Sequence, residues 1–233
     1  MAKLDIVGIG PGLADYITPA AKKAVQRADI VIGAQRSLAL FSDDLRGESN
    51  VLTAKNLQYL LEKAAQAVEA DKKVVLLSTG DPGFSGLLHT VLESGLFDAN
   101  NIQVIPGVSS IQACAARLNI NWDTAILFTF HAGIVSDEQR TKLASAVQGG
   151  YTIILLPDQR NFTPKNIANF LLKNKADPKI QVYVCENLTL ENEKITQTTL
   201  EEIEDQNFSA LCVMVIKQTT NNSVKRYGKE LGV

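Results

Sequence analysis

The chain has 233 residues, 45% hydrophobic and 21% charged, which is the composition of a folded globular protein. Its formal net charge of −2 excludes the broad basic surface that nucleic-acid binding requires. Cys114, Cys185 and Cys212 form no closely spaced pair, which argues against a disulfide framework or a zinc site and favours a reducing compartment. The apolar runs are too short to cross a membrane, and no signal-peptide pattern precedes them. We therefore expect a cytoplasmic protein.

Strands and helices alternate through the first half of the chain. An apolar run at residues 4–9 ends in the glycine-rich segment GIGPG, and a helix is expected to follow, with Thr18 as N-cap and Pro19 at its first position. Further strands are expected at residues 29–33, 74–78 and 102–105, and helices at residues 57–68, 108–118 and up to about residue 94. This alternation predicts an α/β fold with a largely parallel sheet.

The second half of the chain contains as many strands as the first but fewer helices. Strands are expected at residues 151–156, 181–185, 194–198 and 210–216, with one helix at residues 163–173. The last two strands have no long helix between them, so we expect them to pair antiparallel. A boundary near residues 119–123 divides the chain into an N-terminal domain, residues 1–120, and a C-terminal domain, residues 121–233.

The GIGPG segment at residues 8–12 is either a plain turn or a loop that faces a ligand. The dinucleotide fingerprint GxGxxG does not fit, because Leu13 occupies the position of its third glycine. Pro11 also lacks the N–H group that a phosphate cradle would use. A Walker A loop is excluded because no Gly-Lys-Ser/Thr follows.

Two further loops follow predicted buried strands, at the edge where ligands bind in open α/β sheets. They read GDPGF at residues 80–84 and PGVSS at residues 106–110. Each also has a structural interpretation: Asp81 as a helix N-cap before Pro82, and Ser109 or Ser110 as the cap of the next helix. Two such loops on neighbouring strands predict one crevice lined by backbone, in which glycine lets a ligand approach.

Together, GIGPG, GDPGF and PGVSS resemble the tetrapyrrole methylase family, over about residues 3–217. The resemblance implies a two-domain α/β fold, with a mostly parallel N-terminal sheet and a mixed C-terminal sheet with flanking helices. It also implies that S-adenosylmethionine binds between the domains, that the N-terminal domain forms the substrate cleft and part of the cofactor site, and that the C-terminal domain completes that site. GAQRSL at residues 33–38 and RLNINWD at residues 117–123 are similar to the branch that methylates carbon 5 of a precorrin ring. That branch often has S-x-H-G-R where this chain reads TFHAG at residues 129–133, so His131 is kept and the arginine is missing.

The resemblance assigns roles to individual residues. His131 and Asp81 are the candidate catalytic residues, although a lone histidine at a strand end is also often a packed, hydrogen-bonded residue. Arg36 is either a surface residue or a clamp on substrate carboxylates. The expected cofactor contacts are Ile9, Asp81, Gly83, Phe84, Ser109, Ser110, Leu156, Pro157, Ala210 and Leu211, and the expected substrate contacts are Gly10, Pro11, Gly12 and Arg36.

The resemblance also implies binding partners. It predicts a tetrapyrrole substrate, a homodimer, no protein-bound metal, and a separate protein for the neighbouring carbon-15 methylation and decarboxylation. Two alternatives remain open: another activity within the family, on a different precorrin carbon or of the diphthine synthase type, and a nucleotide-binding module without catalysis.

Overall fold

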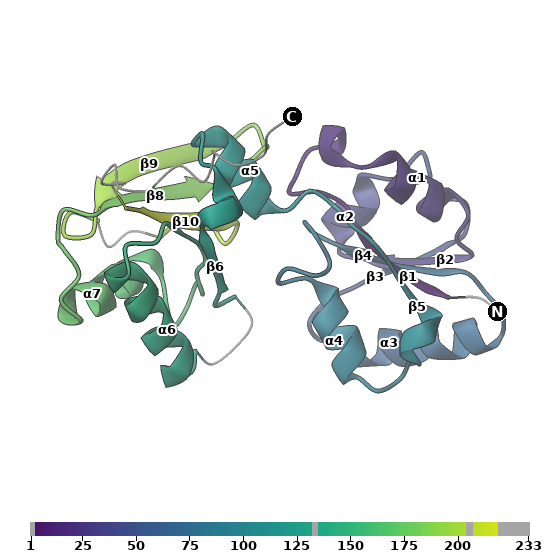
Figure 1. The fold of residues 1–233 in the computed structure, drawn as a ribbon. Helices are drawn as coiled ribbons and strands as arrows, with labels where there is room; N and C mark the ends of the chain where they lie inside the picture. Colours follow the sequence, from purple (N-terminus) through teal and green to yellow (C-terminus); the bar gives the residue numbers. More distant parts are fainter. Residues whose placement is uncertain (1–2, 132–134, 204–206, 219–233) are drawn as a thin grey trace, which may run out of the picture. The chain divides into compact units, whose positions relative to one another are not determined.

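The computed structural model describes residues 3–131, 135–203 and 207–218, which form two compact units (Figure 1). Unit 1 comprises Met1–Ile120 together with Asn187–Lys194. Unit 2 comprises Asn121–Glu186 and Ile195–Val233. The chain therefore leaves unit 1 after residue 120 and returns to it for one short segment.

The sheet of unit 1 has five strands in the order β3-β2-β4-β1-β5, and every neighbouring pair is parallel. The central strands are apolar and buried on both faces, which is typical of parallel sheets covered by helices on both sides. This confirms the predicted parallel sheet. The strands are β1 (Leu4–Gly8), β2 (Ile30–Gly33), β3 (Glu48–Val51), β4 (Val74–Ser78) and β5 (Ile102–Ile105).

Helices cover both faces of this sheet (Figure 1). On one face, α3 packs its apolar stripe against Leu4 and Ile6, and on the other face Val7 and Val31 pack against α1. Thr18 caps α1 as predicted, because its Oγ1 accepts the Ala21 N–H at 3.1 Å. The helices are α1 (Pro19–Gln26), α2 (Gln35–Ala39), α3 (Leu57–Glu69), α4 (Leu87–Glu93) and α5 (Ser110–Arg117), with 3₁₀ turns at Ala14–Tyr16 and Ala99–Asn101.

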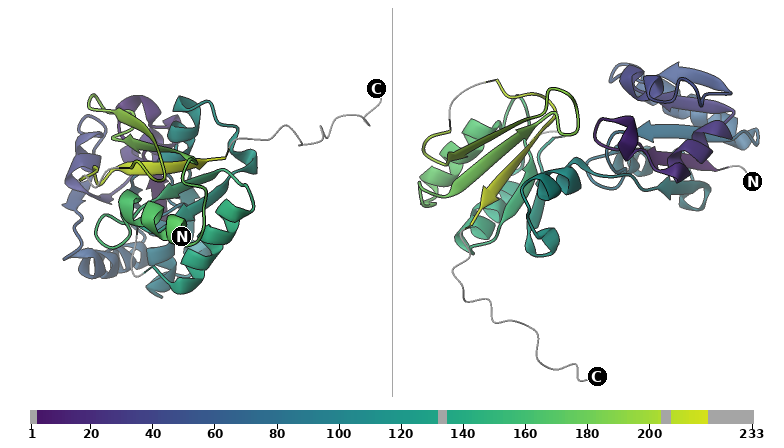
Figure 2. Two further views of the ribbon diagram at one scale, coloured as in Figure 1. Left: turned by 90° about the vertical axis from the view of Figure 1, so that its left-hand side faces the viewer. Right: turned by 90° about the horizontal axis from the view of Figure 1, so that it is seen from above.

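Unit 2 contains a mixed sheet in the order β6-β7-β10-β8-β9, with α6 and α7 over one face (Figures 1 and 2). Strands β6 and β7 are parallel, and β10 is antiparallel to both β7 and β8. The elements are a 3₁₀ turn (Trp122–Thr124), β6 (Ile126–Thr129), α6 (Asp137–Gln148), β7 (Ile153–Leu156), α7 (Pro164–Lys173), β8 (Gln181–Glu186), β9 (Lys194–Thr199) and β10 (Cys212–Lys217).

The predicted direct pairing of the last two strands is wrong, because β8 lies between β9 and β10. Strand β10 reads CVMVIK, and its first five residues are buried, so it takes a central position. Strand β9 reads KITQTT and is largely exposed or half-buried, which suits an edge. Burial, and not order along the chain, determines which strands are neighbours here.

Candidate functional site

Three loops meet at one edge of unit 1, where the adjacent strands β4, β1 and β5 end. The Ile9 N–H donates to the Ser78 carbonyl at 3.0 Å, and the Gly80 N–H donates to the Gly10 carbonyl at 2.9 Å. Gly10 adopts a φ of +82°, a conformation that favours glycine. The first two predicted loops are thus joined by backbone hydrogen bonds beyond the ends of their strands.

Glycines pack directly against one another where the loops meet. A Cβ built on Gly107 would lie 2.4 Å from the Gly80 carbonyl oxygen and 2.6 Å from the Gly8 carbonyl carbon. A Cβ on Gly8 would lie 2.5 Å from the Gly107 nitrogen. At these two positions, glycine is therefore required by contact between backbones. The sequence analysis expected these glycines to leave space for a ligand, but the contacts around them are with backbone atoms of the other loops.

Asp81 connects the second and third loops. Its Oδ1 accepts the Gly83 N–H at 2.8 Å, and its Oδ2 accepts the Gly107 N–H at 3.1 Å. The interpretation of Asp81 as a helix N-cap is wrong, because α4 begins at Leu87, whose N–H donates to the Ser78 hydroxyl at 3.2 Å. Since the carboxylate is bonded to both loops, Asp81 fixes their relative position.

The two serines of the third loop differ in their surroundings. Ser109 is buried and caps α5: its Oγ accepts the Ile111 N–H at 3.3 Å, and its own N–H donates to Gln112 Oε1 at 2.8 Å. This confirms the capping interpretation for Ser109. Ser110, the first residue of α5, is half-buried, as is Phe84 of the second loop.

Arg36 lies at the same edge of unit 1. It is an exposed residue of α2, the helix after β2, and β2 pairs with β4. Its Nη2 donates to Thr79 Oγ1 at 3.3 Å, immediately before the second loop. A guanidinium has five N–H donors in a fork, so this contact leaves donors for an anionic ligand.

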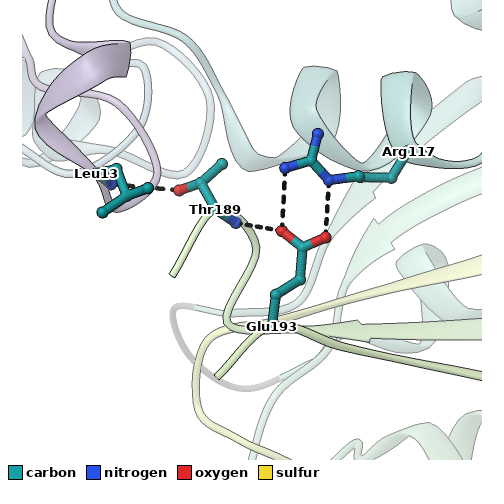
Figure 3. A network of polar contacts seen from close by, with 4 residues as sticks. All are labelled: Leu13, Arg117, Thr189 and Glu193. Atoms are coloured by element: carbon teal, nitrogen blue, oxygen red, sulfur yellow. Dashed lines mark hydrogen bonds and ion pairs between the residues drawn. The ribbon is translucent and has the colours of Figure 1, made fainter. Parts of the chain in front are cut away.

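The end of the first loop is held by a segment that sequence reasoning missed. The Leu13 N–H donates to Thr189 Oγ1 at 3.3 Å, and Thr189 in turn contacts Glu193, which pairs with Arg117 (Figure 3). Leu13 and Thr189 are separated by 176 positions along the chain, and no local pattern marks such a contact.

The predicted residues of unit 2 gather at one edge of its sheet. Strands β6 and β7 are parallel, and β10 runs opposite to β7, so the ends of the first two strands and the start of β10 share an edge. The Phe130 N–H, just before His131, donates to the Leu156 carbonyl at 2.8 Å. His131 and Ala210 are exposed, Leu156 and Leu211 are half-buried, and Pro157 is buried.

Asp158 is an ionised group beside His131 at this edge. Burial raises the pKa of Asp158, but the backbone N–H groups of Asn161, Arg160 and Phe162, with the nearby His131, together hold that pKa below its usual value. Within the histidine motif, residues 132 and 133 lie outside the described residues. The resemblance places residues 156–158 near the cofactor but assigns the Asp158 carboxylate no role of its own.

Cys212 is the first residue of β10 and lies at the same edge of the sheet. Its Sγ lies 3.3 Å from the Gln159 Nε2 donor. Burial, the largest influence, raises the pKa of the Cys212 thiol to about 11. The group is therefore a neutral thiol at physiological pH and has little nucleophilic character.

The described part of the chain lacks two further features. Within residues 3–131, 135–203 and 207–218, no group of three or more His, Cys, Asp or Glu side chains could hold a metal ion. Within the same ranges, no helix is both long and apolar enough to cross a membrane.

These features define a class of protein: a two-unit α/β protein in which three glycine loops meet at the edge of a parallel sheet where such sheets commonly bind ligands. The family model of the Tetrapyrrole (Corrin/Porphyrin) Methylases matches residues 3–204. The chain belongs to this family, which confirms the resemblance drawn from its three glycine motifs. Its members use S-adenosylmethionine, and the chain is accordingly a methyltransferase that depends on this donor.

Three known proteins illustrate the similarity. A probable cobalt-precorrin-7 C(5)-methyltransferase of Methanocaldococcus jannaschii is 41% identical over 210 residues, covering 90% of this chain and 95% of that protein. The cobalt-precorrin-7 C(5)-methyltransferase of Salmonella typhimurium is 32% identical over 192 residues, covering 82% and 88%. A uroporphyrin-III C-methyltransferase of Thermus thermophilus, solved with S-adenosylhomocysteine, superimposes with a TM-score of 0.72 at 22% identity, covering 93% and 97%.

Proposed function

We propose that this protein transfers a methyl group from S-adenosylmethionine to carbon 5 of cobalt-precorrin-7, a step of cobalamin biosynthesis. The observation that carries the proposal is the 41% identity to the relative from Methanocaldococcus jannaschii, which extends over 95% of that relative's length. When bound, S-adenosylmethionine supplies a methyl carbon that its sulfonium has already activated. What the protein must add is alignment with the ring carbon and exclusion of water.

The cofactor site that we propose uses the edge of unit 1 where the three loops meet. Asp81 supports this role, because its carboxylate oxygens each accept one N–H and keep further acceptor capacity, and a negative charge suits a cationic donor. Gly83 is exposed beside it, and a Cβ there would meet Asp81 Oδ1 at 3.2 Å. The remaining proposed contacts are Ile9, Phe84, Ser109 and Ser110 in unit 1, and Leu156, Pro157, Ala210 and Leu211 in unit 2.

Gly10, Pro11 and Gly12 would contact the tetrapyrrole, together with the exposed guanidinium of Arg36. A precorrin ring has several carboxylates while the protein carries a net charge of −2, so recognition depends on a few placed cations. Arg36 satisfies this need, since its hydrogen bond to Thr79 directs it toward the loop edge. His131 is exposed and adjacent to the charge of Asp158, and we propose that it orients the ring or accepts a proton.

The proposal extends to the cellular setting. We assign unit 1 the substrate cleft and part of the cofactor site, and unit 2 the rest of that site. We infer a cytoplasmic homodimer, and the cytoplasmic setting fits Cys114, Cys185 and Cys212, which form no disulfide with one another. A separate protein would carry out methylation at carbon 15 and the associated decarboxylation.

Turnover with two substrates tests the proposal. The protein is incubated with labelled S-adenosylmethionine and either cobalt-precorrin-7 or cobalt-precorrin-4, and the products are weighed by mass spectrometry. One labelled methyl group on the first substrate and none on the second is the expected result. Transfer to the second substrate alone would place the activity elsewhere in the family. Calorimetric binding of S-adenosylhomocysteine without any transfer would contradict the assigned substrates, and absence of binding would contradict the methyltransferase.

A further inference from the structure

The segment Asn187–Lys194 connects β8 and β9 in sequence but belongs to unit 1. Glu193 is its centre: Oε1 accepts from Arg117 Nε at 2.7 Å, and Oε2 accepts from Arg117 Nη2 at 3.3 Å and from the Thr189 N–H at 2.6 Å (Figure 3). Arg117 is the last residue of α5. One carboxylate therefore joins the end of a helix to the turn at Thr189, through a two-pronged contact of the strong, charge-assisted kind.

Thr189 connects this carboxylate to the first glycine loop. Its Oγ1 accepts the Leu13 N–H at 3.3 Å, as Figure 3 shows. Gly12 lies directly against the same turn, since a Cβ there would be 2.7 Å from Thr189 Oγ1 and 2.7 Å from Leu190 Cδ2. Two consecutive loop residues are thus held, one by a hydrogen bond and the other by close packing.

The backbone of this turn is strained. Thr189 has a φ of 71°, in the left-handed region where a β-branched residue is a clear outlier, whereas Asn187, with a φ of 52°, is of a residue type that adopts this region readily. Thr189 is also 4% exposed. Such conformations persist only where the surroundings enforce them, and they cluster at functional sites. Here the bonds to Glu193 and Leu13 hold the residue on both sides.

We propose that Glu193 and Thr189 are positioning residues that set the geometry of the Pro11–Gly12–Leu13 loop against the tetrapyrrole. The inference rests on the proposed function, which places Gly10, Pro11 and Gly12 at the substrate. It predicts that these two residues govern substrate binding and leave cofactor binding alone. The reason is that the opposite end of α5 is fixed independently by the capping box of Ser109 and Gln112.

The test compares two variants of Thr189. Thr189→Gly removes the hydroxyl that Leu13 uses but relieves the positive φ, so the melting temperature is expected not to fall. The KM for cobalt-precorrin-7 should rise roughly fivefold, the ratio for loss of one hydrogen bond, while the S-adenosylhomocysteine Kd stays unchanged. Thr189→Ser keeps the hydroxyl that accepts the Leu13 N–H, so its KM should equal that of the wild type.

A second pair of variants separates Glu193 from ion pairs in general. Glu193→Gln should also raise the KM, because it weakens the contact with Arg117. Glu48→Gln is the matched control: Glu48 pairs with Lys63 at 2.5 Å in the same unit but on the edge strand β3, and its loss should leave the KM unchanged.

The outcomes distinguish failure of the proposed function from failure of the positioning role. If the wild-type protein does not methylate the tetrapyrrole, the proposed function fails and the positioning role fails with it. If wild-type turnover is normal and Thr189→Gly and Glu193→Gln keep the wild-type KM, the positioning role alone is wrong. A parallel loss of melting temperature and cofactor affinity in Thr189→Gly would show that Thr189 supports the fold, and would likewise overturn the inference.

Discussion

Gly107→Ala is expected to disrupt the meeting point of the three loops. The new Cβ would lie 2.4 Å from the Gly80 carbonyl oxygen and 2.6 Å from the Gly8 carbonyl carbon, distances that real Cβ atoms essentially never show. Both atoms are backbone, so no side chain can turn away. Overpacking of this kind costs about 1–3 kcal/mol, and loss of the Asp81–Gly107 hydrogen bond adds about 1 kcal/mol. Because the loops must separate, we expect S-adenosylhomocysteine affinity to fall at least about tenfold, which corresponds to roughly 1.4 kcal/mol.

Urea titration and calorimetry measure these effects. Far-UV circular dichroism follows both units, whereas the fluorescence of Trp122 reports on unit 2, so the loss of stability should be greater by circular dichroism. Gly83→Ala is the matched control, because Gly83 is exposed and the nearest atom to its new Cβ would be Asp81 Oδ1, at 3.2 Å. The unfolding free energy of this variant should stay within about 0.5 kcal/mol of the wild-type value. If Gly107→Ala matched wild type in stability and affinity, the loop packing would not constrain the site.

Three further variants or modifications test individual groups. Arg36→Ala should weaken tetrapyrrole binding by about 1.5–3 kcal/mol without changing S-adenosylhomocysteine affinity. Arg36→Lys should retain only part of the tetrapyrrole affinity. An unchanged KM for the tetrapyrrole in Arg36→Ala would show that Arg36 has no role in substrate binding. Burial raises the pKa of Cys212 to about 11, so iodoacetamide at neutral pH should alkylate this thiol far more slowly in the folded than in the denatured protein. Equal alkylation rates, measured by peptide mass spectrometry, would contradict this. Burial also raises the pKa of Asp5 above 3.8, so the folded state holds its proton more tightly and stability falls as pH rises through the folded pKa. Asp5→Asn should then increase the unfolding free energy at neutral pH by about 0.5 kcal/mol and give no gain below the unfolded pKa, as measured by urea titration.

Local patterns were sufficient to predict most of unit 1. The apolar run of β4 and the glycine loops after β1, β4 and β5 indicated a parallel sheet with a ligand edge, because burial on both faces leaves a continuous apolar signature. The sequence predicted a cap at Ser109 or Ser110, and the structure shows that Ser109 forms it together with Gln112. A further helix, α6, was not predicted, although Ser136 and Gln139 form a capping box that marks its start.

Long-range contacts account for what the sequence did not reveal. Asp81 has the local features of an N-cap, but its carboxylate bonds to Gly107, 26 positions further along the chain. The support of Leu13 by Thr189 depends on the return of one short segment to unit 1, and neither residue type nor spacing indicates it. Pairing of β10 with β8 was likewise decided by burial. Site residues that act through distant backbone groups are therefore the ones that a single sequence hides.

The position of the transferred methyl group tests the central claim most directly. Cobalt-precorrin-7 is incubated with the protein and S-adenosylmethionine labelled with carbon-13 in its methyl group, and tandem mass spectrometry locates the label among the ring fragments. The proposed function predicts a single labelled methyl group on carbon 5 and release of one S-adenosylhomocysteine per product. A labelled methyl on any other ring carbon would contradict it.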